Sequence, residues 1–259
     1  MSSIQIPTWL DATKEVDPAN PSTPTGKKLY DALGEKEAKA FFLLTCLAAT
    51  LQADPEITVK KALEVVANAV VETGWGKSWV EYNFGGWKIN RADVEAYRLA
   101  HNGESPRWWR AAGHTKSGDA PVVFYQVFKN PDSFFKAWLL RFVPKNKKPG
   151  EHRYAVTGAK FWNDDPSWFF ELCVAGYKGE VTAANPGPSV AAHKSIITNM
   201  KPLIAQKLLE VTPDGVWGRG TIAACQRFQA QHNLSVTGTL TAETFSKLIE
   251  VWKASDYQL

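Results

Sequence analysis

The sequence predicts a mainly α-helical protein with two domains, and three segments carry this prediction. Apolar residues recur every three or four positions over 59–72. Pro131 opens a second segment with the same spacing over 131–142. Near the C-terminus, Thr241 is a plausible N-cap for a helix over 242–252. The chain has 259 residues and 44% hydrophobic content, which is longer than one average domain and enough for a sizeable core.

The first half of the chain is expected to form an irregular arm, several helices and a hairpin. Residues 1–26 are the arm, because 17–26 are rich in Pro, Ser, Thr and Asn. Helices are expected at 29–33, 35–52, 58–73 and 92–101. Two β-like runs, Arg107–Ala112 and Pro121–Phe128, flank a turn at 113–119 and predict a small β-hairpin.

The second half is expected to be helical throughout. Helices are predicted at 131–142, 165–175 and 189–210, with a loop at 184–188. The helix at 189–210 runs from the first domain, 27–195, into the second, 196–259. We find no internal repeat in the sequence.

An acidic residue closes the helix at 58–73, and a glycine turn with aromatic residues follows it. The string is Glu72-Thr73-Gly74-Trp75-Gly76-Lys77-Ser78, and helical spacing puts Glu72 beside the apolar Val65 and Ala69. A carboxyl group partly withdrawn from water favours its protonated form. The general acid of glycoside hydrolysis needs this form, so Glu72 is the predicted catalytic acid.

This string and the following Tyr82-Asn83-Phe84-Gly85-Gly86-Trp87-Lys88-Ile89 resemble the active-site signature of peptidoglycan glycosidases of the glucosaminidase and lysozyme-like superfamily. The resemblance implies a lysozyme-like α+β catalytic domain over 27–195 that cleaves the β-1,4 glycan backbone of the bacterial wall. A muramidase is favoured. An N-acetylglucosaminidase and a lytic transglycosylase remain alternatives, as does a wall-binding protein with an inactive hydrolase-like domain.

Glycoside hydrolysis usually needs a second group, and several carboxylates compete for this role. Glu81 is preferred because it lies nine residues after Glu72, beyond the glycine turn. Asp119, on the turn of the predicted hairpin, is the rival, and Glu95 and Glu104 rank behind it. An enzyme that uses Glu72 alone, with the acetamido group of the substrate or a tyrosine, is the remaining option.

Aromatic and amide side chains near these acids are candidates for sugar contacts, since aromatic rings stack on pyranose faces. The chain has eleven Trp, far above ordinary usage. The resemblance places Tyr177 near the acid, although Lys178-Gly179-Glu180 departs from the usual continuation. The predicted substrate-binding residues are Trp75, Tyr82, Asn83, Trp87, Tyr125, Gln126 and Tyr177.

A second resemblance lies at the C-terminal end. The residues that carry it are Asp214-Gly215-Val216-Trp217-Gly218, Thr221, Phe228-Gln229, Asn233-Leu234, Thr237-Gly238, Thr241 and Thr244. In this order they resemble the small helical peptidoglycan-binding domain that accompanies many wall hydrolases. The resemblance implies a three-helix domain over 196–259 with peptidoglycan as its partner.

Composition bears on partners and location. The net charge of +4 and the pI of about 8.8 are too mild to indicate nucleic-acid binding. The N-terminus lacks the features of a signal peptide, and no apolar run reaches membrane-spanning length. We therefore expect a monomer that is made in the cytoplasm. It is expected to reach the wall by phage-type release, as an endolysin does, or through a secretion apparatus, as an antibacterial effector does. A further alternative is that the chain is a fragment of a larger parent chain.

No cofactor or metal is expected. A zinc site needs clustered ligands, whereas the five histidines are scattered singly along the chain, at His101, His114, His152, His193 and His232. The three cysteines, Cys46, Cys173 and Cys225, read as buried free thiols in helical segments.

Overall fold

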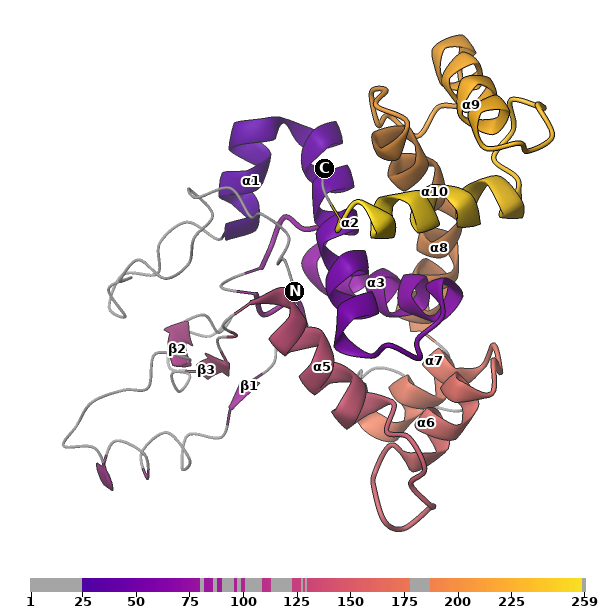
Figure 1. The fold of residues 1–259 in the computed structure, drawn as a ribbon. Coiled ribbons are helices and arrows are strands. Elements are labelled where there is room, and N and C mark those ends of the chain that lie inside the picture. Colours follow the sequence, from indigo (N-terminus) through magenta and orange to yellow (C-terminus); the bar gives the residue numbers. More distant parts are fainter. Residues whose placement is uncertain are drawn as a thin grey trace.

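The computed structural model describes residues 25–79, 82–85, 88–89, 96, 99–100, 109–112, 123–126, 128, 130–177 and 187–257. The described part is mainly helical, which confirms the prediction of a mainly α-helical protein (Figure 1). Its principal helices are α1 (Thr25–Leu33), α2 (Glu35–Ala53), α3 (Val59–Thr73), α5 (Pro131–Phe142), α6 (Ala155–Trp162), α7 (Trp168–Leu172), α8 (Gly187–Leu208), α9 (Arg219–Gln231) and α10 (Ala242–Ala254). A π-helical turn, Cys173–Tyr177, continues α7.

Hydrophobic periodicity gave several of these bounds to within a residue. The predicted helix at 131–142 coincides with α5, whose N-cap Asn130 accepts a hydrogen bond from the backbone N–H of Ser133. The sequence did not indicate α6, because glycine is a poor helix former. Gly158 is needed there for packing, since a Cβ at this position would lie 2.2 Å from the carbonyl oxygen of Pro144.

The core is built around α2, which is buried on almost every side along residues 42–51. A helix that is apolar all round lies inside a domain. Helices α3, α5 and α8 contact α2, and α8 also packs on α3. Figure 1 shows α2 and α3 between α5 on one side and α8 and α10 on the other. This arrangement fixes the end of α3, where Glu72 lies, against the rest of the core.

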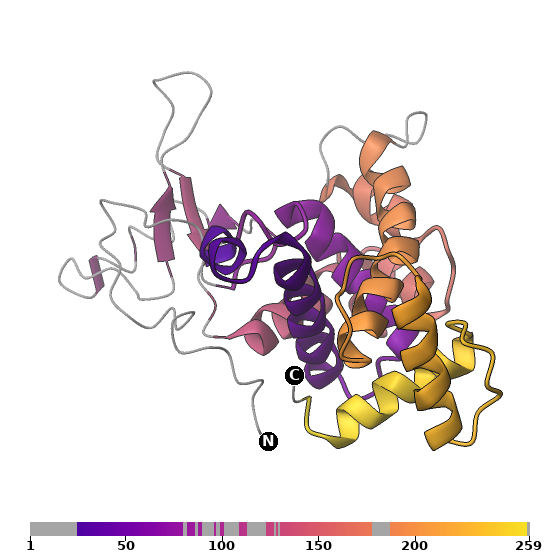
Figure 2. The same ribbon diagram turned by 90° about the horizontal axis from the view of Figure 1, so that it is seen from above.

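A small antiparallel sheet contains β1 (Lys88–Ile89), β3 (Val123–Gln126) and β2 (Trp109–Ala112), in that order. Trp109 pairs with Gln126, and Lys88 pairs with Tyr125. Both views show the sheet on the side of the molecule away from α9 and α10 (Figure 2). The turn residues 113–122 lie outside the described residues, so the hairpin itself and the lysozyme-like α+β fold stay predictions.

Helix α8 joins the two parts of the chain. It packs on α3, α2 and α10, and Lys207 in its last turn pairs with Glu37 of α2. Met200 and Ile204 on this helix are fully buried. The predicted domain boundary at 195/196 therefore falls inside one helix. No helix in the described ranges combines the length and the apolar run needed to cross a bilayer.

His193 lies on α8 and is buried in an apolar setting. Its Nε2 lies 2.8 Å from the carbonyl oxygen of Glu64, so Nε2 carries the proton and donates it. The ring stacks on Phe169 with a centroid separation of 3.9 Å. Burial lowers the pKa of His193 to about 4.

The free energy of unfolding is expected to fall as the pH drops from about 6.5 to about 4, because His193 is buried without a proton on its second nitrogen. The unfolded chain binds this proton below about pH 6.5, while the folded chain does not do so until about pH 4. Between these values acid favours the unfolded state, by about 2–3 kcal/mol at pH 4.5. Urea unfolding at pH 7 and 4.5 measures this loss. In His193→Gln, which keeps a donor but does not titrate, the loss should be smaller by that amount. An equal loss in both proteins would rule out His193 as its source.

Candidate functional site

The turn after α3 fixes the position of Glu72. Gly74 caps the helix with φ 58°, and Gly76 has φ 82°. A Cβ on Gly76 would lie 2.5 Å from the ring of Phe42, so the second glycine is required for close packing as well as for its backbone angle. The Thr73 hydroxyl donates to the carbonyl of Ala69 at 2.7 Å and accepts from the backbone N–H of Gly76 at 2.9 Å. These contacts hold the Glu72–Gly76 segment in one conformation.

The Tyr177 hydroxyl lies against the same face of α3. It accepts a hydrogen bond from Asn68 Nδ2 at 2.8 Å and one from Trp138 Nε1 at 3.4 Å. These two donors occupy the acceptor capacity of the oxygen, so the phenolic proton must go to a third group. Glu72, four residues after Asn68 on α3, makes a side-chain hydrogen bond with Tyr177. The arrangement therefore has Tyr177 donating to the Glu72 carboxylate.

Tyr177 keeps its proton over a wide pH range. Burial is the largest cause that raises the pKa of Tyr177 well above its ordinary value, and the charge of Glu72 adds to it. The hydroxyl is therefore a permanent donor to Glu72 under working conditions. A donor that stays protonated stabilises the carboxylate that remains after Glu72 gives up a proton.

The π-helical turn puts Tyr177 in this position. Arg153 Nε donates to the carbonyl of Ala175 in that turn at 2.6 Å, and the Tyr177 ring meets Phe142 edge to face at 4.8 Å. Single π-helical turns are frequent at functional sites. The loop at 82–85 also lies close to Tyr177, since a Cβ on Gly85 would lie 3.8 Å from the Tyr177 hydroxyl.

Two residues of this arrangement were not predicted as site residues. Asn68 is 2% exposed, and its Oδ1 has no hydrogen-bond partner among the described residues. The available signal was a lone amide four residues before the predicted acid, on an otherwise apolar helical face. Trp138 lies in the core, and its indole N–H also bonds Tyr177.

The other predicted site residues separate into two groups. Tyr82 and Asn83 are buried, with Tyr82 stacked on Trp79 at 5.8 Å and Asn83 Oδ1 3.4 Å from the backbone N–H of Gly85. Both residues shape the loop near Tyr177, and their contact with sugar stays a prediction. The residues Glu81, Trp87, Glu95, Glu104 and Asp119, and the side chains of Tyr125 and Gln126, lie outside the described residues.

Trp75 lies away from the Tyr177 cluster in its described contacts. It lines a cavity of about 280 Å³ together with Pro202 and Val216 of the C-terminal part. Lys39 Nζ lies 5.6 Å from the centre of its ring. Trp75 therefore lies across this cavity from the turn that contains Asp214. Its binding of sugar near Glu72 stays a prediction.

In the C-terminal part, two buried glutamines each hold one turn. Gln206 Nε2 donates to Asp214 Oδ1 and to the carbonyl of Val216, both at 2.9 Å. Its Oε1 accepts from the backbone N–H of Gly215 at 2.7 Å. Nε2 also lies 3.2 Å from Thr221 Oγ1 on α9.

Gln229 repeats this pattern 23 positions later, so the prediction of no internal repeat was wrong. Its Nε2 lies 3.2 Å from Thr237 Oγ1, 3.0 Å from the carbonyl oxygen of Thr239 and 2.9 Å from Thr244 Oγ1, while its Oε1 accepts from Gly238 N at 2.9 Å. The backbone repeats as well: Glu210 and Asn233 have φ 57° and 55°, and Gly215 and Gly238 have φ 78° and 71°. The repeat is hidden in the sequence because few of the paired positions carry the same residue.

Comparison with known proteins identifies this C-terminal part. Residues 201–248 match the family described as "Putative peptidoglycan binding domain". Both glutamine-held turns lie within the matched range. No curated protein and no solved structure matches the chain. The match supports a protein associated with the bacterial cell wall, with peptidoglycan as its partner.

Proposed function

We propose that this protein hydrolyses the β-1,4 glycan backbone of peptidoglycan, with Glu72 as the general acid and the C-terminal domain holding the wall. The observation that carries the proposal is the hydrogen-bond chain from Asn68 and Trp138 through Tyr177 to Glu72, in a protein that also has a wall-binding domain. Such a chain gives one carboxyl group a fixed orientation and a fixed donor. The fixed orientation suits a group that must deliver one proton to one oxygen, and the donor stabilises the carboxylate that this delivery leaves behind.

In the proposed reaction Glu72 protonates the glycosidic oxygen as the bond to the leaving sugar breaks. The Tyr177 hydroxyl, held by its two donors, stabilises the carboxylate that results. Glu81 then activates water or stabilises the oxocarbenium-like state, with Asp119 as the alternative second acid. The proposed site of action is the bacterial wall, which the protein reaches after release or secretion.

The products distinguish the proposed muramidase from its alternatives. Wild-type protein is expected to release muropeptides with an ordinary N-acetylmuramic acid at the reducing end, because water attacks that sugar. Mass spectrometry of borohydride-reduced digests of purified sacculi measures this. An N-acetylglucosamine reducing end would indicate a glucosaminidase, and anhydro-muramic products would indicate a lytic transglycosylase.

A second candidate function is wall binding without cleavage. It is favoured by the family match, which covers the C-terminal domain and not the Glu72 region. In this case no soluble muropeptide would appear at any enzyme concentration, although the protein would still sediment with sacculi. That outcome would overturn the hydrolase proposal and leave the wall-binding proposal standing.

A further inference from the structure

The cavity of about 280 Å³ beside Trp75 lies where the C-terminal part of the chain meets the turn after α3. We call it the α2–α8 cavity. The lining residues that matter here are Lys36 and Lys39 of α2, Trp75, Pro202 of α8, and Asp214 and Val216 of the following turn. The volume lies just below the range of about 300–1,000 Å³ that is usual for small-molecule sites, so it suits a short part of a larger ligand.

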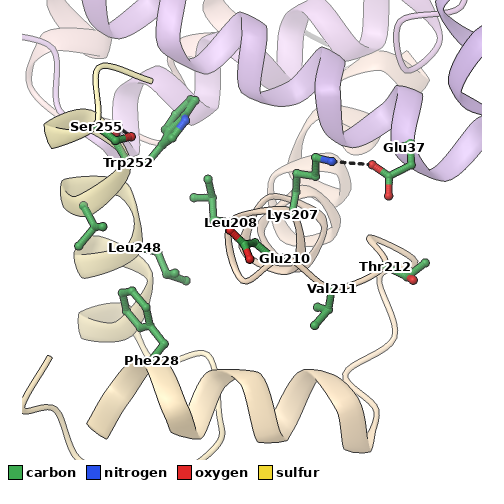
Figure 3. Close-up of a pocket in the computed structure, with 11 residues that line it drawn as sticks. Glu37, Lys207, Leu208, Glu210, Val211, Thr212, Phe228, Leu248, Trp252 and Ser255 are labelled. Atoms are coloured by element: carbon green, nitrogen blue, oxygen red, sulfur yellow. Dashed lines mark hydrogen bonds and ion pairs between the residues drawn. The ribbon is translucent and has the colours of Figure 1, made fainter. Parts of the chain in front are cut away.

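The walls of this cavity are anchored to the core. Helices α2 and α8 pack on each other, and Lys207 Nζ near the end of α8 pairs with Glu37 Oε2 on α2 at 2.8 Å (Figure 3). The carbonyl of Trp75 accepts a hydrogen bond from the Tyr30 hydroxyl of α1 at 2.5 Å. A site whose walls are already held in place loses less entropy when a ligand binds.

Trp75 has an unusual backbone conformation for a large side chain. Its φ is 62°, a left-handed value at which glycine is relaxed and an aromatic residue is strained. The ring is half-buried and lines the cavity, with Lys39 Nζ 5.6 Å from its centre. Backbone strain of this kind concentrates at ligand sites. The chain keeps an aromatic ring where glycine would be relaxed, which points to a role of this ring in the cavity.

The lining of the α2–α8 cavity is positively charged. Among its described residues, the ammonium groups of Lys36 and Lys39 outnumber the single carboxylate of Asp214. Lys39 Nζ also pairs with Glu35 at 2.7 Å, but this carboxylate lies 3.6 Å from Lys77 Nζ as well. Glu35 is thus shared between two ammonium groups, and the region keeps a net positive charge.

Lys36 is the ammonium group that remains available to a ligand. It is exposed and makes no ion pair with any residue in the described part of the chain. Asp214 Oδ1 accepts from the backbone N–H of Val216 at 2.9 Å, so it is engaged within its own turn. This hydrogen bond is the main cause that lowers the pKa of Asp214, and the nearby charge of Lys36 adds to it. Lys36 therefore supplies a positive charge that an incoming anion can pair with.

A larger cavity, of about 550 Å³, lies between the end of α8, α9 and α10 and has the opposite charge (Figure 3). Its charged lining residues are Glu37, Lys207 and Glu210, and Lys207 is already paired with Glu37. Carboxylates are repelled there and attracted by the α2–α8 cavity. In peptidoglycan the sugars of the glycan strand are neutral, whereas the stem peptides carry carboxylates. Charge therefore favours the stem peptide as the ligand of the α2–α8 cavity.

The position of the cavity also suits a stem peptide. Trp75 is three residues after Glu72, so their Cα atoms are at most about 11 Å apart. An extended peptide spans about 3.3–3.6 Å per residue. A stem peptide on a sugar that is bound at Glu72 can therefore reach the cavity within about three residues.

We infer that the α2–α8 cavity binds the stem peptide of peptidoglycan. Lys36 and Lys39 pair with its carboxylates, while the ring of Trp75 and the apolar Pro202 and Val216 contact its methyl groups. The inference rests on the proposed function, and it names the part of the wall that is recognised beside Glu72. The cavity directs the enzyme to glycan that carries peptides.

The test uses the full-length chain with Glu72→Gln, which prevents turnover. Calorimetric titration compares the tetrapeptide N-acetyl-L-Ala-γ-D-Glu-L-Lys-D-Ala with the same peptide after amidation of its carboxylates. The charged peptide is expected to bind at least about tenfold more tightly, because charged hydrogen bonds are lost on amidation. Its affinity should also fall as the salt concentration rises.

Two exposed lining residues are changed, each with a matched control. Lys36→Gln removes the available charge and should weaken binding of the charged peptide about 3–10-fold. Lys28→Gln is its control, because Lys28 is an exposed lysine of α1 outside the cavity lining. Val216→Glu adds a carboxylate to the lining and should weaken binding at least as much. Its control is Val236→Glu, since Val216 is 66% exposed and Val236, which does not line the cavity, is 56% exposed.

The outcomes separate this inference from the proposed function. Circular dichroism confirms that each variant is folded. If the Glu72→Gln protein does not sediment with sacculi, wall binding itself fails. If it sediments but binds the charged and amidated peptides equally, the α2–α8 cavity is not a stem-peptide site. The same conclusion follows if Lys36→Gln and Val216→Glu bind the charged peptide as well as their controls, or if poly(glycerol phosphate) binds more tightly than the peptide.

Discussion

Glu72→Gln is expected to lower the rate of sacculus digestion by about 10²–10⁴-fold, the contribution of a general acid. The amide keeps the shape of the side chain but has no acidic proton to deliver. Its oxygen still accepts from Tyr177, so the fold and wall binding should be unchanged. Turbidity clearance, circular dichroism and sedimentation with sacculi measure the three properties separately.

Glu64→Gln is the matched control for this substitution. Glu64 lies on the same helix, two turns earlier, and burial raises its pKa. It therefore has one property of a general acid without the contact to Tyr177. Near-normal clearance by Glu72→Gln, or loss of clearance by Glu64→Gln alone, would refute the assignment of the catalytic acid.

Gln206→Leu is expected to destabilise the protein by about 3 kcal/mol. The substitution leaves the backbone N–H of Gly215 and the carbonyl of Val216 without their buried partner. Gln229→Leu should have a similar effect, because Gln229 makes the same set of contacts in the second turn. Urea unfolding followed by circular dichroism measures both changes.

Gln226→Leu is the control for the glutamine prediction. Gln226 lies on α9, near Gln229, but it is exposed. Its replacement should change stability by no more than about 0.5 kcal/mol. If Gln206→Leu and Gln229→Leu unfold at the same urea concentration as Gln226→Leu, the buried glutamines do not hold the turns energetically.

Sequence patterns within one segment predicted the helices and turns that interactions within that segment determine. The periodicity of residues 131–142 gave α5, and the acid followed by two glycines gave the turn after α3. The contact between Asn68 and Tyr177 joins residues 109 positions apart, and no helical or strand period reports such a pair. The repeat around Gln206 and Gln229 was missed for another reason: hydrogen-bonding geometry is shared where the side chains differ, as at Asp214 and Thr237.

Helix α8 has a consequence for how the proposed enzyme meets its polymer. A flexible linker would let a binding domain and a catalytic site search independently, and its length would set their effective concentration. Here one helix is buried against both parts, with Met200 and Ile204 in the common core. The position of the C-terminal domain relative to Glu72 is then fixed by the fold. Under the proposed function, the protein would gain from binding at both places only where two stretches of glycan already lie at that spacing, so the architecture of the wall would select the bonds that are cut.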